Sequence, residues 1–319
     1  MLSRVADTLY WMSRYLERAE HTARLLDLQL HMMLELEPEE SENRWGRVAS
    51  SLFVPIPPTL AADAYNMTQL LTFDSENGNS IHSCIASARE NARHVREQIS
   101  SEMWEQVNRL SLQVKSTQIN NIWNEQPHEF FRSVKEGIHL FQGITDSTMN
   151  HGEGWHFIQI GRSIERAMAT CTLIKVHYQA WAKLNYRQTV TGTFMEWIAL
   201  LKSCTAFEAY CKVYTADLRP DHIAEFLILN PEFPHSIRFC VNRIHSALQT
   251  AALSTESKRA RQVNRLAGRL RATLDYGQID EITESGLYAY LDDVQRQCSQ
   301  IHDAIYAAYI TYSIEEMVS

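Results

Sequence analysis

Apolar residues recur near the start of the chain at alternating steps of four and three. They are Val5, Leu9, Met12, Leu16, Ala19, Ala23, Leu26, Leu30 and Met33. Because an α-helix turns once in about 3.6 residues, this spacing places all of them on one face. We therefore predict one long helix, with Ser3 as its N-cap and an end before Pro38.

The same kind of pattern returns further along the chain. It predicts helices over residues 60–71, 80–99, 103–112 and beyond, and 130–149. We interpret residues 37–42 as an acidic, solvated break, and residues 54–58, which include three prolines, as an extended connection. The whole chain has only 11 Gly and 8 Pro, too few for a sheet protein with many turns. The predicted fold class is therefore all-α.

Two pairs of segments repeat each other at similar displacements. Residues 14–22 match 162–170 (165 − 17 = 148), residues 71–84 match 227–240 (236 − 80 = 156), and a weaker echo relates Phe131 to Tyr288 (288 − 131 = 157). Collinear repeats indicate duplication. We predict a tandemly duplicated helical bundle with pseudo-two-fold related halves, residues 1–150 and 151–319, packed as one continuous body. In both copies the serine that starts the later helix, Ser80 or Ser236, is expected to be an N-cap rather than a nucleophile.

The charge balance limits the classes of partner. The 319 residues carry a formal net charge of -8 with a pI near 5.9, which opposes a nucleic-acid-coating role because phosphate binding needs a concentrated basic surface. The sequence offers neither the apolar region of a signal peptide nor a membrane span, so we expect a cytoplasmic protein without a membrane partner. Its six cysteines are scattered, and we expect them to be reduced and mostly buried.

Charged residues gather on the side of the first predicted helix opposite its apolar stripe. They are Arg14, Glu17, Arg18 and His21, and the second copy repeats Arg162, Glu165 and Arg166. Four apolar residues share that side, namely Tyr10, Leu25, Leu28 and Met32. A helix that is apolar on two faces is normally covered on both, so these charges are expected to be paired in a central groove. A solvated ladder of ion pairs is the alternative.

A second charged cluster lies within residues 87–97. It contains Glu90, Asn91, Arg93 and Arg96. One interpretation is a solvated helix face, and the other is a groove for carboxylate or phosphate groups, which guanidinium groups bind in pairs of hydrogen bonds. The sequence does not decide between them.

The known catalytic and metal-binding templates are missing from the sequence. It has no phosphate-cradling glycine loop, no His-Glu-x-x-His and no Gly-x-Ser-x-Gly. Glu17 and His21 have a spacing that suits a metal, but Glu165 faces Ala169 at the same spacing, and the neighbouring arginines would repel a cation. We therefore expect neither a metal nor a cofactor bound directly by this chain.

Three motifs together resemble the bacterial alpha-E family, an all-helical domain with a Glu-Arg signature. They are residues 11–20, 88–93 and 160–167, and the resemblance covers nearly the whole chain. It implies association with a circularly permuted ATP-grasp ligase, a transglutaminase-like protein and a proteasome-related peptidase. It also implies a part in peptide synthesis or modification by amide-bond formation, with ATP and Mg used by the ligase.

The leading hypothesis is a non-ATP-binding component of such a ligase system. Its arginines would bind the partner or a peptide or acidic substrate, while Glu17 and Glu165 would orient them. Two alternatives stay open. In one the chain is a stand-alone enzyme with Glu17 and Glu165 as general acid and base, and in the other it is a scaffold held by buried ion pairs.

Overall fold

The computed structural model describes residues 3–33, 38–124, 127–184, 190–252 and 258–310, and all regular structure in these ranges is helical. The N-terminal part contains α1 (Ser3–Met33), α2 (Pro38–Ser51), α3 (Ala64–Thr72), α4 (Ile81–His94), α5 (Ser101–Ser116), α6 (Ile119–Asn124) and α7 (Pro127–Thr148). The all-α prediction is confirmed for this part of the chain.

The second part of the chain begins with another long helix. It contains α8 (Glu153–Leu184), α9 (Val190–Ser203), α10 (Phe207–Tyr214), α11 (Pro220–Leu229), α12 (Ile237–Ala252), α13 (Lys258–Tyr276), α14 (Ile279–Ser285) and α15 (Leu287–Ile305), followed by a π-helical turn, η1 (Tyr306–Ile310). No helix in the described ranges combines the length and apolarity needed to cross a bilayer.

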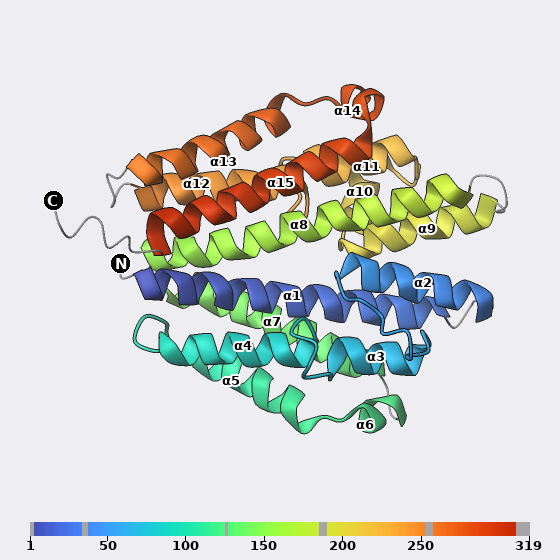
Figure 1. The fold of residues 1–319 in the computed structure, drawn as a ribbon, viewed down its shortest axis with the longest axis horizontal. Helices are drawn as coiled ribbons and strands as arrows, with labels where there is room; N and C mark the ends of the chain where they lie inside the picture. The colour runs from blue at the N-terminus through green and yellow to red at the C-terminus, as the bar shows by residue number, and fades with distance from the viewer. Residues whose placement is uncertain (1–2, 34–37, 125–126, 185–189, 253–257, 311–319) are drawn as a thin grey trace.

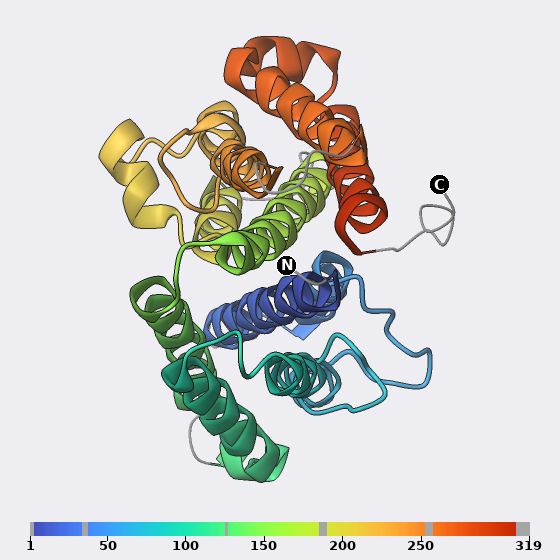
Figure 2. The ribbon, with the colours of Figure 1, turned by 90° about the vertical axis from the view of Figure 1, so that its left-hand side faces the viewer.

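The two longest helices, α1 and α8, lie side by side through the middle of the molecule. Figure 1 shows α3 to α7 on one side of this pair and α11 to α15 on the other, and Figure 2 shows the same division from the end. One contiguous hydrophobic core runs through both sides. Side chains between α1 and α8 therefore lie in the middle of the molecule.

A glycine allows the close approach of the central pair. A Cβ atom at Gly161 of α8 would lie 2.3 Å from Ser13 Oγ and 2.4 Å from the Tyr10 carbonyl oxygen of α1. Only a residue without a side chain fits this contact. The Glu-Arg segments of the two helices, a few residues further on, are brought together by it.

Two serine caps position the helices that flank the central pair. Ser80 Oγ accepts from Ser83 N at 3.1 Å at the start of α4, and Ser236 Oγ accepts from Phe239 N at 3.1 Å at the start of α12. Both N-cap predictions are confirmed. Five of the six cysteines are buried, Cys211 is half-buried and all six are free, as expected.

One predicted break is wrong. Within residues 37–42, expected to be a solvated break, Pro38 instead begins α2. Proline is favoured at the first position of a helix, where its missing N–H would have no helical partner. The turn predicted near residue 150 is present between α7 and α8, and residues 54–58, predicted to be an extended connection, contain no helix.

Candidate functional site

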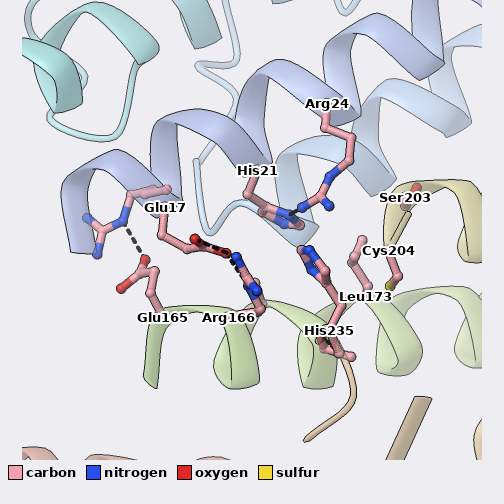
Figure 3. Close-up of a pocket in the computed structure, with 12 residues that line it drawn as sticks. Glu17, His21, Arg24, Glu165, Arg166, Leu173, Ser203, Cys204 and His235 are labelled. Atoms are coloured by element: carbon pink, nitrogen blue, oxygen red, sulfur yellow. Dashed lines mark hydrogen bonds and ion pairs between the residues drawn. The ribbon is translucent and has the colours of Figure 1, made fainter. Parts of the chain in front are cut away.

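Glu17 of α1 is held by an arginine from the second half of the chain. Arg166 of α8 donates Nε to Glu17 Oε1 at 2.5 Å and Nη2 to Glu17 Oε2 at 3.0 Å, and Gln142 of α7 lies 3.4 Å from the second oxygen. The Glu17 side chain is only 2% exposed. Figure 3 shows the two side chains facing each other across the helix pair.

Glu165 of α8 is held by two arginines from the first half. Arg14 Nε and Arg18 Nε each lie 2.7 Å from a different oxygen of its carboxylate. Burial opposes ionisation of Glu165, but Arg14 and Arg18 outweigh it and lower the pKa of the carboxyl below its ordinary value. The two Glu-Arg dipeptides of the sequence therefore bind each other in a crossed arrangement, each carboxylate taking guanidinium groups from the opposite half.

The fourth arginine of the two Glu-Arg segments is not paired in the same way as the other three. Arg162, which corresponds to Arg14, donates Nη2 to Gln159 Oε1 at 2.6 Å. Among the described residues no carboxylate forms an ion pair with it. Burial, and then the neighbouring Arg166, lower the pKa of Arg162 to about 10.

A small inner cavity of about 20 Å³ lies beside the crossed pairs. Its wall includes Glu17, Arg18, His21, Arg24, Glu165, Arg166 and His235. Burial, and then Arg24, lower the pKa of His21 to about 3, so its imidazole is neutral. Arg24 Nη2 donates to His21 Nδ1 at 3.2 Å, which leaves the proton of the neutral ring on Nε2.

Several buried donors at this cavity have no partner in the described part of the protein. They are His21 Nε2 and the Nε and Nη1 atoms of Arg24. Unpaired buried donors are costly, and a polar cavity of this size accommodates about one water molecule or one ligand oxygen. The inner cavity is thus suited to an acceptor oxygen rather than to a cation.

A larger outer pocket of about 150 Å³ adjoins the inner cavity. The two spaces share Arg18, His21, Glu165 and Ala169. The remaining wall of the outer pocket consists of Arg14, Ser51, Leu52, Phe53, Asn79 and Met168. Arg18 Nη1 donates to Asn79 Oδ1 at 2.7 Å, whereas no acceptor among the described residues takes up its Nη2 atom. The pocket therefore combines apolar walls with an available guanidinium donor.

Phe53 at this pocket has an unusual backbone. Its φ is 54°. It lies in the turn just after α2, where Phe53 N donates to Ser50 O at 3.3 Å and Val54 N donates to Ala49 O at 3.0 Å. This left-handed position normally holds glycine, and a larger residue there costs about 1 kcal/mol. The side chain is 64% exposed, so burial in the core does not offset that cost.

The predicted residues of α4 and of the turn that follows it lie elsewhere. Glu90 and Arg93 form an exposed ion pair at 2.5 Å, and Asn91 is half-buried on the same helix. Exposed Arg96 lies over the ring of Trp104, 5.4 Å from its centroid. The structure brings Arg14, Glu17, Arg18, His21, Arg162, Glu165 and Arg166 together along α1 and α8, but it does not bring the α4 cluster to them.

Sequence reasoning missed several residues of the site and its surroundings. Two of them carry a signal in the sequence that could have identified them: Arg24 is spaced i,i+3 from His21, and Asn79 directly precedes a predicted N-cap. No residue type signals the left-handed backbone of Phe53. A second buried cluster joins Arg44 of α2 to Glu196 of α9 at 2.6 Å. Its residues are far apart in sequence, so only the fold reveals the pairing.

Comparison with known proteins covers nearly the whole chain. A family model described as a predicted alpha-helical domain with a conserved ER motif matches residues 1–310. The sequence has two such Glu-Arg dipeptides, at 17–18 and 165–166, and both take part in the crossed pairs.

Relatives of this chain occur in mycobacteria. It is 23% identical over 312 residues to the uncharacterized proteins Mb2597 of Mycobacterium bovis and Rv2567 of Mycobacterium tuberculosis. The match covers 91% of this chain and 34% of each relative, so the chain spans about a third of the length of the curated relatives it matches. No solved structure gives a significant match.

Proposed function

The chain belongs to the Alpha-E family, and on that premise we propose that it is a non-ATP-binding component of a peptide-synthesis or peptide-modification system. In this proposal it binds a carboxylate-bearing peptide or acidic substrate in the outer pocket. A circularly permuted ATP-grasp partner in the cytoplasm uses ATP and Mg to form the amide bond. The observation that carries the proposal is the available Arg18 donor beside apolar walls.

The ligand class follows from the donors that line the two adjoining spaces. Arg18 Nη2, His21 Nε2 and Arg24 Nη1 are N–H donors without partners in the described ranges, and carboxylate oxygens are the acceptors that guanidinium groups bind best. Leu52, Phe53 and Met168 suit an apolar side chain next to that carboxylate. A peptide terminus or an acidic residue with an apolar neighbour fits both features.

The enzyme alternative is less well supported by the geometry. A general acid or base needs a carboxyl group that can exchange a proton near neutral pH. Glu165 accepts from two arginines that lower its pKa, and Glu17 accepts twice from Arg166. We therefore assign both carboxylates an orienting role for the arginines rather than a catalytic one.

The scaffold alternative has one observation in its favour. The crossed ion pairs are largely buried between the halves, and buried pairs of this kind can specify how helices pack. The scaffold and binding roles are compatible, because the same pairs hold Arg14 and Arg18 at the pocket wall.

We also propose that the two halves arose by duplication about a pseudo-two-fold axis. The crossed Glu17 and Glu165 pairs support this, as do the matching serine caps. A further pair of equivalent contacts joins Cys84 Sγ to the Gly78 carbonyl at 3.7 Å and Cys240 Sγ to the Pro234 carbonyl at 3.6 Å. Arg162, which forms no ion pair with a described carboxylate, then marks divergence of the second copy.

Co-expression with the ATP-grasp protein of the same gene cluster tests the proposal. We expect co-purification and an ATP turnover, measured against an amino-acid and peptide panel, that depends on this chain. Arg18→Gln should reduce that turnover, whereas Arg93→Gln, in the exposed α4 ion pair, should not. A ligase that is fully active alone and recovers none of this chain would refute the proposal. The transglutaminase-like protein and the proteasome-related peptidase are proposed as further partners and can be tested in the same pull-down.

A further inference from the structure

A second polar cluster surrounds Asp27, further along α1. The buried Asp27 carboxylate lies 2.6 Å from His128 Nδ1 through Oδ1 and 2.6 Å from Lys135 Nζ through Oδ2. His31 Nδ1 is 3.6 Å from Asp27 Oδ1, and the rings of His31 and His128 stand almost perpendicular with centroids 4.4 Å apart. One carboxylate and two imidazoles thus offer ligand atoms that all lie within 4.8 Å of one another.

The hydrogen bonds around the cluster orient its ligand atoms. His31 Nδ1 donates to the Asp27 carbonyl oxygen at 2.9 Å, one helical turn back, which leaves the His31 Nε2 lone pair available. Lys135 donates to Asp27 Oδ2 and His128 donates to Asp27 Oδ1, so an ion at Oδ1 replaces only the hydrogen bond from His128. Partners of this kind fix the orientation of metal ligands in known sites.

From this geometry we propose that Asp27, His31 and His128 form a binding site for a divalent transition-metal ion, with zinc as the ion that these ligands suit. Two imidazoles and one carboxylate are a common protein ligand set for zinc. The His31 and His128 side chains are 52% and 46% exposed, so an ion can enter from solvent and keep an open coordination position.

Metal binding requires a rearrangement of the hydrogen bond between His128 and Asp27. The proton that His128 Nδ1 donates to Asp27 Oδ1 passes through solvent to His128 Nε2, so the imidazole stays neutral, and the ion takes the place of that proton between the two atoms. Their 2.6 Å separation must widen to about 3 Å, because metal-ligand distances near 2.0–2.2 Å hold neighbouring ligands further apart than a hydrogen bond does. The Lys135 ammonium opposes the incoming charge, so the affinity is lower than that of a closed structural zinc site.

The cluster is independent of the proposed peptide pocket. Asp27 lies ten residues beyond Glu17 (27 − 17 = 10), about 15 Å along α1 at the helical rise. None of its three proposed ligands lines the inner cavity or the outer pocket. Failure of either proposal therefore leaves the other untouched.

Metal titration of the full chain tests this site. After chelation and removal of the chelator, Zn²⁺ is titrated by calorimetry and Co²⁺ by visible absorption, on the wild type and on His31→Gln, His128→Gln and His151→Gln. His151 is an exposed histidine outside the cluster and serves as the control for weak metal binding by the other histidines among the 13 of the chain. Melting temperatures in chelator establish that each variant is folded.

We expect saturable binding of one ion per chain in the wild type and in His151→Gln. His31→Gln and His128→Gln should each weaken it at least about tenfold and abolish the Co²⁺ absorption bands. Wild-type dissociation constants weaker than about 1 mM, or equal affinities in all four proteins, would overturn the proposal.

Discussion

Arg166 and Glu17 are 149 residues apart in the sequence, yet the Arg166 Nε atom lies 2.5 Å from a carboxylate oxygen of Glu17 between the two central helices. Glu17 is almost fully buried there, and Arg166 is its only cationic partner in an ion pair within the described ranges. The ion pair is therefore a direct energetic link between the two halves of the chain.

Removing Arg166 should destabilise the protein strongly. Arg166→Met leaves the buried Glu17 carboxylate without its partner, and breaking a buried pair in this way costs about 3–5 kcal/mol. Arg162→Met is the matched control, because Arg162 lies one turn away on α8 and has no carboxylate partner among the described residues; its cost should stay within about 1 kcal/mol. Urea unfolding measures both, and equal losses would show that the ion pair contributes nothing specific.

Gly161 should be intolerant of any side chain. Gly161→Ala places a methyl group 2.4 Å from the Tyr10 carbonyl oxygen, so α1 and α8 must move apart, at a cost of about 1–3 kcal/mol or more. Gly143→Ala on the exposed face of α7 meets no atom within 4 Å and should stabilise the helix by up to about 1 kcal/mol. Thermal unfolding of both variants checks the contrast, and a Gly161→Ala variant as stable as the wild type would contradict it.

Lowering the pH should destabilise the protein at pH values well above those at which carboxylates ordinarily titrate. Burial, and then Arg24, hold the pKa of His21 at about 3, while unfolded histidine titrates near pH 6.5. Between these values the unfolded chain binds more protons than the folded one, so the free energy of unfolding falls as the pH is lowered from about 6.5 towards 3. Urea unfolding between about pH 7 and pH 5 measures the slope, which should be smaller in His21→Asn. Identical slopes in the two proteins would contradict this assignment.

Phe53→Gly should raise stability while weakening peptide binding. Glycine removes the cost of the left-handed backbone, a gain of about 1 kcal/mol, but it also removes the aromatic wall of the outer pocket. Thr215→Gly is the control, because Thr215 has a φ of 57°, is exposed and lies outside the pocket. It should gain stability with no change in the binding of an acidic peptide measured by calorimetry. Equal binding by wild type and Phe53→Gly would exclude Phe53 from the site.

The sequence predicted the helical class, the long first helix and the need to pair its charges. Periodicity and apolar residues on two faces are local signals, and they are strong over a helix as long as α1. They also led to the expectation that the two Glu-Arg segments share a central groove. The error at Pro38 arose because acidic residues suit a solvated loop and the first turn of a helix equally well.

The sequence does not show which charged residues form ion pairs with each other. The pattern of charges requires pairing, but Arg18 has Glu17 beside it in sequence and nevertheless binds Glu165. That choice follows from the crossing of α1 and α8 at Gly161, which no local pattern encodes. The Asp27 cluster is similar: the i,i+4 spacing of Asp27 and His31 was visible in the sequence, whereas His128 joins them only through the packing of α7 on α1.

The crossed ion pairs also bear on how the chain matures during its synthesis. When the ribosome has produced α1 to α7, Glu17 still lacks its guanidinium partner, and Arg14 and Arg18 still lack the carboxylate of Glu165. Burying the charged face of α1 at that stage would be unfavourable, so the nascent N-terminal half must keep this face hydrated until α8 has emerged. Completion of the interior therefore waits for translation of residue 166, and a nascent chain arrested before that point should remain a substrate for chaperones and proteases.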